Sequence, residues 1–460
     1  MRAFTPGASV VVSLHSSSAV RASALHAAQA MGLLLIASAL FLLPFGRTME
    51  IPLALLALVG LWAVWRERRL PAGREAAAIR LFLLCCVCYQ LPMWLSLPDA
   101  VNPARSLTTT LGSLRYLLAG IGVLCLLCVL PSDPHHQRLF DALEKTLFAV
   151  LALWVGDALL QAASGSNLLG YAAERGYLNG LFGAGENLKL SLALLVLGPP
   201  ALLGRMRRKS PGLTLLLFLL AVLVLLLTGK RSAWVTFALQ CALFVLFYRQ
   251  ALRRRLTGVV VIGGLCVLLV LSLALNSSRV IERSGTLIAA VQAPDYAHVN
   301  VATGLRLPIW QGALAMLADH PVNGVGVRGF RYAYADYAVD GDPFASTDAH
   351  GAALASHAHL LLFELLADTG IFGLTGHAAL LILLGGAWRR CSRLQREQAL
   401  PWLLSALALA HPLNTQGAWY SSWTASLFWL VLVLAVVRLE PLRRVRDVYP
   451  CIRRESNHTG

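Results

Sequence analysis

Charged residues are scarce in this chain, at 13% of its 460 residues, where soluble domains carry about 25%. Hydrophobic residues make up 57%, in apolar runs of about 17–25 residues that lack the alternation of a β-strand. This composition excludes an ordinary soluble enzyme. Because lipid leaves backbone polar groups no outside partner, the spanning segments must be helices. We therefore predict an all-α polytopic membrane protein of about twelve transmembrane helices.

Neither the cysteines nor the glycine motifs of this chain indicate a function. Seven of the nine cysteines lie in apolar runs, and none falls in the long polar segment at residues 276–355. No P-loop is present, and the glycines at 324–329 follow no predicted strand, so they do not form a dinucleotide fingerprint. Asp340 and Asp342 are the nearest approach to a chelating pair, but two carboxylates in a loop are too few for a metal site. We predict no metal and no cofactor.

The short loops alternate in basicity. Roughly 27 of the 39 Lys and Arg fall on one side, which the positive-inside rule makes cytoplasmic, so both termini are expected there. The net charge of +16 is then orientation charge on the inner leaflet, and it requires no nucleic acid partner. The predicted spans are residues 27–45, 51–65, 79–97, 111–131, 140–163, 186–204, 212–228, 232–248, 257–275, 356–387, 399–416 and 418–437.

One polar segment divides the chain into four parts. Residues 1–275 carry spans one to nine, 276–355 form a large external segment, 356–437 carry spans ten to twelve, and 438–460 form a basic cytoplasmic tail. Within the external segment, residues 302–321 have apolar positions at helical spacing. We expect one amphipathic helix there, ended by His320, and then a loop rich in tyrosine and aspartate.

Several cations lie outside the cytoplasmic side, against the orienting bias. Lys230 and Arg231 are the sharpest case, because they occupy a tight turn between two strongly apolar runs. A cation at the edge of the lipid is costly unless it finds a partner. One interpretation is snorkelling to the lipid headgroups, and the other is a bound anion such as phosphate, whose oxygens match a guanidinium fork.

Two histidines, His357 and His359, stand where the external segment meets the tenth predicted span. We expect Ser356 to cap that helix and both histidines to fill its first turn, whose positive end would keep the rings neutral. A neutral imidazole can accept a proton as a general base, and free N–H groups of the turn could hold an anion. The alternative is an interfacial pair with a packing role.

Taken together, these features resemble the O-antigen ligase family, within a superfamily that also holds O-antigen polymerases and protein O-oligosaccharide ligases. His359 followed by Gly370 and Gly373 is similar to the family's histidine signature. Leu360 departs from the small polar residue that is usual beside this histidine. The resemblance rests on four stretches, which are residues 175–187, 230–234, 306–326 and 359–373.

The resemblance implies a metal-independent, inverting glycosyltransferase of GT-C-like architecture. It would transfer O-antigen from undecaprenyl pyrophosphate onto lipid A-core oligosaccharide in lipopolysaccharide biosynthesis, at the periplasmic face of a bacterial inner membrane. His359 would be the catalytic base. The donor pyrophosphate would be bound by Arg231, Lys230 and Arg306, with possible support from His357, Arg175, Arg328 and His320.

Other functions fit part of the pattern. An O-antigen polymerase or a protein O-oligosaccharide ligase of the same superfamily would carry these motifs and differ in its acceptor. A transporter or flippase is the alternative of another class. Against it, no internal repeat is visible and the unusual charges lie on the external side. Glu186 and Lys189, both near the sixth predicted span, are the contrary sign, although as a pair they could be structural.

Overall fold

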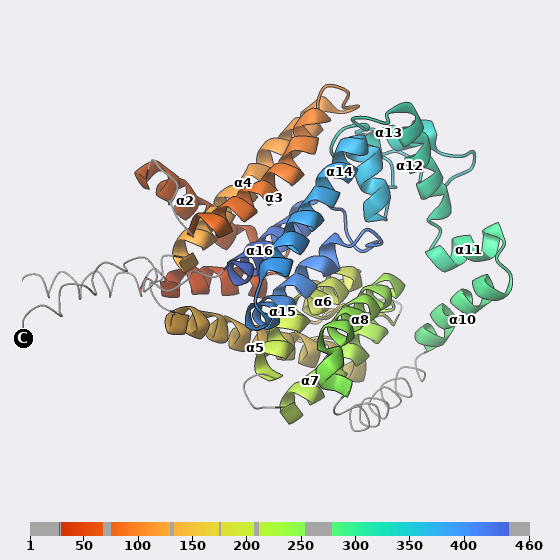
Figure 1. Cartoon of the computed structure of the whole chain (residues 1–460). Helices are drawn as coiled ribbons and strands as arrows, with labels where there is room; N and C mark the ends of the chain where they lie inside the picture. The colour runs from red at the N-terminus through yellow and green to blue at the C-terminus, as the bar shows by residue number, and fades with distance from the viewer. Residues whose placement is uncertain are drawn as a thin grey trace, which may run out of the picture.

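The computed structural model describes residues 27, 29–67, 75–128, 133–173, 176–206, 211–253 and 278–440. Helices joined by turns make up most of this part (Figure 1), and isolated β-bridges join Ser166 to Ala172 and Thr347 to Ala353. The predicted all-α class is therefore confirmed. Each predicted span overlaps a described helix except the ninth, at residues 257–275, which lies outside the described residues.

Seven of the described helices are long and apolar enough to cross a membrane. The count of twelve spans and the division into four parts stay predictions. The first part of the chain forms an unlabelled helix (Gln29–Phe41), α2 (Glu50–Glu67), α3 (Glu75–Leu95), α4 (Pro103–Cys128), α5 (Asp133–Ser164), the short 3₁₀ helix η1 (Gly180–Phe182), α6 (Asn187–Met206), α7 (Pro211–Leu227) and α8 (Arg231–Arg253). The last part forms α14 (Leu361–Arg390), α15 (Arg393–Ala410) and α16 (Ser422–Leu439).

Helix α16 is the central helix of the bundle (Figure 1). Its residues from Thr424 to Leu439 are all buried, and it packs against α3, α4 and α15. Trp429 meets the rings of Phe82 and Tyr89 edge-on, at centroid distances of 5.8 and 5.3 Å. A helix that is apolar on every face can lie in a core or face lipid, and α16 lies in the core.

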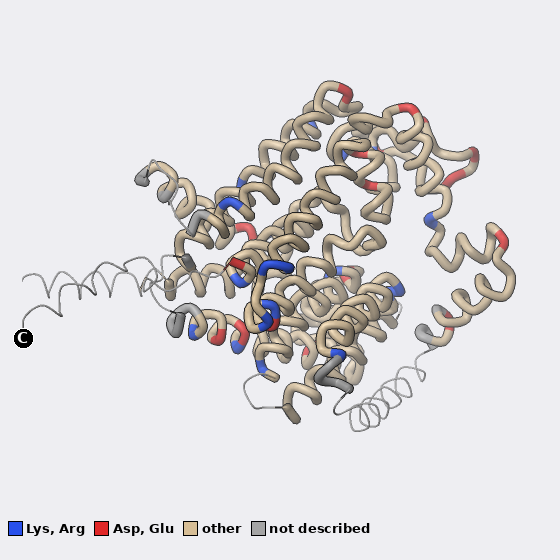
Figure 2. Tube along the Cα trace, viewed as in Figure 1, with Lys and Arg blue, Asp and Glu red and all other residues tan. Residues whose placement is uncertain are grey.

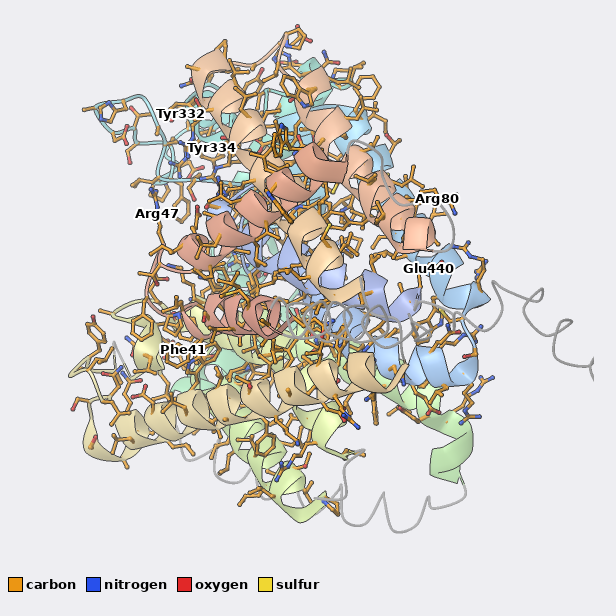
Figure 3. All side chains as sticks on the ribbon, turned by 90° about the vertical axis from the view of Figure 1, so that its left-hand side faces the viewer. Phe41, Arg47, Arg80, Tyr332, Tyr334 and Glu440 are labelled. Carbon is orange, nitrogen blue, oxygen red and sulfur yellow. The ribbon has the colours of Figure 1, made fainter. Side chains whose placement is uncertain are left out.

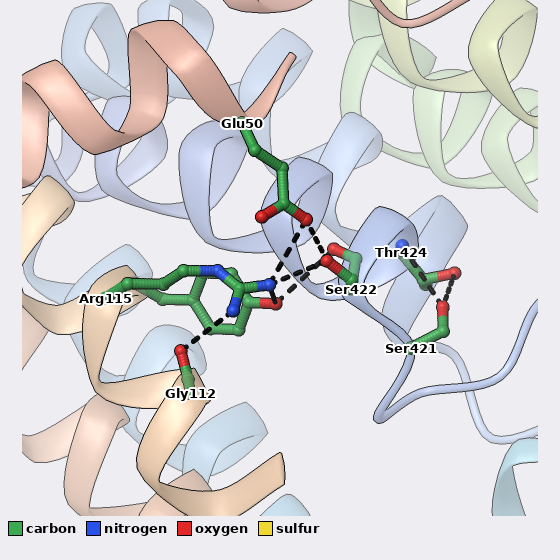
Figure 4. Close-up of polar contacts among 7 residues, drawn as sticks. Glu50, Gly112, Arg115, Ser421, Ser422 and Thr424 are labelled. Atoms are coloured by element: carbon green, nitrogen blue, oxygen red, sulfur yellow. Dashed lines mark hydrogen bonds and ion pairs between the residues drawn. The ribbon is translucent and has the colours of Figure 1, made fainter. Parts of the chain in front are cut away.

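Arg115, one of the cations predicted to lie away from the cytoplasmic side, has a structural role. Its guanidinium pairs with Glu50 at 3.2 Å and donates to the Ser422 hydroxyl at 2.6 Å, so the group joins α2, α4 and α16 (Figure 4). Glu186 and Lys189 also form an ion pair, at 2.6 Å, near the start of α6. These partners remove the cost of leaving a cation alone near lipid.

Charge is uneven along the structure. Figure 2 shows most of the bundle without charged residues, while basic residues gather where α14 meets α15. Figure 3 shows Arg47, Tyr332 and Tyr334 on one side of the molecule and Arg80 and Glu440 on the opposite side. Which side faces the cytoplasm stays a prediction.

The described part of the external segment holds four helices, of which the sequence located one: α10 (Ser278–Gln292), α11 (Tyr296–Thr303), α12 (Leu307–Asp319) and α13 (Phe330–Tyr337). Helix α12, with His320 as its C-cap, confirms the predicted amphipathic helix. The expected tyrosine-rich loop is wrong over α13. There Phe330 stacks on Tyr334, and both are buried with Ile309 of α12, so one apolar face favours a helix.

The chain between α12 and α13 is fixed to α14. Val325 N donates to Ala367 O at 2.8 Å, and Ile371 N donates to Pro321 O at 3.0 Å. Gly370 interrupts α14 with φ 60° and ψ −151°, and a Cβ there would lie 2.3 Å from the Val322 carbonyl oxygen. Only glycine allows this close approach. Gly370 of the histidine signature therefore lies where the external segment is attached to the bundle.

Candidate functional site

His357 and His359 lie in the chain that leads into α14. The helix begins at Leu361 with Leu360 as its N-cap, so the expectation that Ser356 caps it and the histidines fill its first turn is wrong. Carbonyl groups of the loop between α15 and α16 take the first two amides instead: Leu361 N donates to Asn414 O at 2.8 Å and Leu362 N to Pro412 O at 3.2 Å. These N–H groups are therefore not available to an anion.

The two imidazole rings are in contact. Their centroids lie 3.8 Å apart with the planes tilted by 44°. His359 has φ 51°, a left-handed conformation that residues other than glycine seldom adopt. Ser356 Oγ lies 3.0 Å from Nδ1 of His357. Nε2 of His357 is buried and has no hydrogen-bond partner within the described residues.

Both rings are held neutral. Burial, followed by the charges of Arg306 and Lys230, lowers the pKa of His359 to about 4. Burial, then His359, then the guanidinium of Arg328 lower the pKa of His357 well below its usual range. The expected neutrality thus has a different cause. Burial and neighbouring positive charges keep the rings neutral, and not the positive end of a helix.

A cavity of about 820 Å³ is lined by the three cations of the predicted donor site. Lys230 and Arg231 reach it from the turn before α8, and Arg306 from the N-cap of α12. No aspartate or glutamate is among the described residues that line it. The other lining residues are Tyr177, Asn179, Gly185, Asn187, Gly229, Ser232, Val235, Leu287, Val301, Ala302, Thr303, Gly304, Leu305, Trp310, Leu413 and Thr415.

Arg231 connects three helices at the wall of this cavity. Its Nη1 donates to Thr286 Oγ1 at 2.9 Å and its Nη2 to Val301 O at 3.3 Å, which joins the start of α8 to α10 and α11. Burial, and then the charge of Arg231, lower the pKa of Arg306, so the two guanidinium groups face a shared space. Two like charges held near one another are stabilised by an anion between them.

The turn that carries Lys230 needs a glycine. Gly229 has φ 68°, and a Cβ there would lie 2.3 Å from the Tyr177 ring. Asn187 Nδ2 donates to Thr228 O at 2.9 Å and holds the turn against the start of α6. The chain therefore sets both cations of the turn at the cavity.

Residues 216–378 match the sequence model of a family described as O-antigen ligase. This segment belongs to the O-antigen ligase family. It runs from α7 into α14, and so includes the basic turn, the external segment and both histidines. Members of this ligase and polymerase superfamily are glycosyltransferase-like enzymes that use lipid-linked polysaccharide. No curated protein matches the chain.

The remaining predicted site residues that the structure describes do not line the cavity. Arg328, with φ 62°, lies on the side of His357, whose pKa it lowers. His320 ends α12, and its backbone N–H donates to Met316 O at 2.8 Å, so its position is that of a helix terminus. Arg175 lies outside the described residues, and its predicted support for the site stays a prediction.

Two buried carboxylates of α14 were not singled out from the sequence. Asp368 accepts hydrogen bonds from the backbone N–H groups of Arg328 and Phe330, at 3.0 and 3.1 Å. Glu364, one turn earlier, accepts from Tyr420 N at 3.4 Å. Ionisable residues four apart in an apolar run were the signal that could have found them, because such residues within a span are seldom idle.

The described residues offer little for a metal. Across residues 29–440, outside the ranges the structure leaves undescribed, no three His, Cys, Asp or Glu side chains gather within reach of one ion. Asp342, one of the two candidate chelators, accepts from the Tyr334 hydroxyl and from Phe344 N. What the O-antigen ligase segment brings together is two neutral imidazoles and a cavity lined by cations.

Proposed function

We propose that this member of the O-antigen ligase family is an inverting glycosyltransferase that works without a metal. It ligates O-antigen from undecaprenyl pyrophosphate onto lipid A-core oligosaccharide. One observation carries the proposal. Lys230, Arg231 and Arg306 converge on one cavity; His359 is not among the residues that line it, but the charges of Arg306 and Lys230 reach its ring.

The cavity suits the leaving group. Negative charge builds on the pyrophosphate as its bond to the anomeric carbon breaks, and fixed cations that face this charge stabilise the transition state. Lys230, Arg231 and Arg306 supply them. Arginine is well matched to the oxygens of a phosphate group, because its N–H groups form a planar fork. The polyprenyl tail would remain in the lipid.

His359 is the base in this scheme. It takes the proton of the acceptor hydroxyl while that oxygen forms a bond to the anomeric carbon and the bond to pyrophosphate oxygen breaks. A single displacement inverts the carbon, and undecaprenyl pyrophosphate departs. A pKa of about 4 makes a weak base. Bound pyrophosphate offsets the charges of Arg306 and Lys230, so the base strengthens once the donor is in place.

The acceptor is the part of the proposal with close rivals. An O-antigen polymerase would use a second lipid-linked repeat, and a protein O-oligosaccharide ligase would use a hydroxyl on a protein. Both would use the same imidazole and the same cations. A transporter or flippase places its charged groups near the midplane of the membrane. The cations here instead lie at the ends of helices and in the external segment.

The test is a transfer assay with the purified full chain in nanodiscs. Undecaprenyl pyrophosphate-linked O-antigen is the donor, chelator is present, and three acceptors are compared: lipid A-core, a second lipid-linked repeat and a serine-containing protein acceptor. We expect transfer to lipid A-core that His359→Ala abolishes. Transfer to either of the other acceptors alone would assign the rival function, and no transfer to any acceptor would reject the enzyme.

A further inference from the structure

The proposed reaction does not use three arginines around His357: the charges of Arg328 and Arg331 act on His357, and the charge of Arg105 acts on Arg331. Arg105 is in the first turn of α4, and the next residue, Ser106, donates its hydroxyl to Val327 O at 3.0 Å, directly before Arg328. Arg331 follows in the first turn of α13. The same chain is further fixed because Val101 N donates to Val325 O at 2.9 Å.

The path from Arg331 to His357 is short and well packed. Ala353 N donates to Arg331 O at 2.7 Å. From there the chain runs through Ala355 to His357, and Ala353, Ala355 and Ala358 are buried in the cluster that contains Phe330. The histidine and the arginines are therefore held on one rigid unit.

Two buried polar atoms of this unit have no partner within the described residues. They are Nε of Arg331 and Nε2 of His357. Nε of Arg331 is a donor, and Nε2 of the neutral His357 ring is one in the tautomer whose Nδ1 accepts from Ser356 Oγ. A buried donor without an acceptor costs free energy that a bound anion would recover. Burial, followed by the charge of Arg328, lowers the pKa of Arg331, as expected where cations outnumber acids.

The acids nearby are already engaged. The two carboxylate oxygens of Asp368 accept hydrogen bonds from the backbone N–H groups of Arg328 and Phe330. Asp348, whose charge reaches Arg331, accepts from His350 N at 2.9 Å and Ala352 N at 3.0 Å. These carboxylates hold loops in place, and neither forms an ion pair with the arginines within the described residues.

We propose that Arg328, Arg331 and Arg105 form a second anion site, beside His357, that binds a phosphate or carboxylate substituent of the acceptor glycan. The proposal rests on the proposed function. In a single displacement the acceptor oxygen and the leaving pyrophosphate lie on opposite sides of the anomeric carbon. The base His359 must contact the acceptor hydroxyl, and the His357 ring is in contact with the His359 ring. Arg105, Arg328 and Arg331 are not among the residues that line the cavity assigned to the pyrophosphate, so an anion beside His357 belongs to the acceptor.

The test compares acceptors and variants in one transfer assay. The full chain in phosphatidylcholine nanodiscs receives intact lipid A-core, lipid A-core stripped of phosphate with hydrofluoric acid, or lipid A-core with its carboxyl groups reduced. Wild type, Arg331→Gln, Arg331→Lys and Arg328→Gln are measured. Arg47→Gln is the matched control, because this exposed arginine lies outside the site. Both KM values and kcat are determined.

We expect Arg331→Gln and Arg328→Gln to raise the KM for intact lipid A-core by about tenfold or more, since a hydrogen bond to a charged group is lost. Arg331→Lys should recover part of this, and donor KM should stay near wild type. At least one modified acceptor should raise the wild-type KM to a similar level, with no further effect of Arg331→Gln.

Several results would overturn the second site. They are an unchanged acceptor KM in both variants, an equal loss on every acceptor, or a rise in donor KM alone. A loss that appears only in phosphatidylglycerol nanodiscs would assign the arginines to a lipid headgroup and would also reject the proposal. If wild type transfers nothing, the proposed function fails. Equilibrium binding of intact lipid A-core to wild type and Arg331→Gln then decides this site alone, with equal affinity counting against it.

Discussion

The imidazole rings of His357 and His359 lie 3.8 Å apart, centroid to centroid, and the charge of Arg306 acts on both. Lys230 acts on His359 from the cavity. Arg328 and Arg331 act on His357, whose pKa is lowered first by burial. Since two imidazolium rings this close would repel each other, both rings stay neutral at neutral pH. The pair lies between the cations of the cavity and the arginines around His357.

Replacing His359 with alanine should reduce ligation by about 10²–10⁴, the usual contribution of general-base help. His357→Ala should lose less, because this ring is not the proposed base. The measurement is the initial rate of transfer from undecaprenyl pyrophosphate-linked O-antigen to lipid A-core. Equal amounts of folded protein, checked by gel filtration in detergent, provide the control. Full surface polysaccharide in cells that carry only His359→Ala would refute the base.

Arg306→Gln should raise the pKa of His359 from about 4 toward its usual value. The direction follows from charge, because a nearby cation disfavours the imidazolium and its removal favours protonation. Activity requires the neutral ring, so the acid limb of kcat/KM should move to higher pH. Arg331→Gln is the matched control, since its charge acts on His357. An acid limb that stays in place in Arg306→Gln would exclude this coupling.

Binding of undecaprenyl pyrophosphate should take up protons at about pH 5.5. The free ring, with a pKa of about 4, is mostly neutral there, and a bound anion shifts its pKa upward. Calorimetric titration in two buffers of different ionisation enthalpy measures the uptake. His359→Gln should bind with less uptake. If both proteins take up the same number of protons, the titrating group lies elsewhere.

Asp368→Asn should loosen the start of α13. An amide offers one oxygen where the carboxylate offers two, and its NH₂ group would face a backbone N–H. We expect a loss of about 1–3 kcal/mol of stability, the cost of an unsatisfied buried donor. Thermal unfolding followed by tryptophan fluorescence measures it. Asp336→Asn, on the exposed face of the same helix, should unfold like wild type. Equal effects of the two changes would remove the special role of Asp368.

Gly370→Ala should destabilise the protein, because φ is 60° there and the added Cβ would meet the Val322 carbonyl oxygen at 2.3 Å. A cost of at least about 1–3 kcal/mol is typical of such backbone strain. Gly385→Ala tests the same substitution further along α14, where nothing lies within 4 Å of the added atom. That change should be neutral or slightly stabilising. Equal melting temperatures for the two variants would contradict the account of Gly370.

Sequence patterns predicted some parts of this structure better than others. Apolar runs located the helices, and residues 302–321 gave α12 with its capping His320. The gathering of Lys230, Arg231 and Arg306 at one cavity could be expected from the resemblance, but not from spacing, because some 75 residues separate the turn from α12.

The misses have a common cause, which is tertiary contact. The start of α14 depends on carbonyl groups about fifty residues away, at Pro412 and Asn414, so local capping rules misplaced His357 and His359. Helix α13 exists because Tyr334 is buried against α12, which no local pattern shows. The hydrogen bonds of Asp368 likewise depend on a distant turn.

The three cations around the 820 Å³ cavity have a consequence for turnover. In the proposed reaction the spent carrier keeps both of its phosphates, so whatever attracts the loaded carrier attracts the empty one as well. Lys230, Arg231 and Arg306 then slow release of the empty carrier at the end of each cycle. Ligation should slow as empty carrier accumulates and recover when a phosphatase removes it, which couples the pace of surface assembly to carrier recycling.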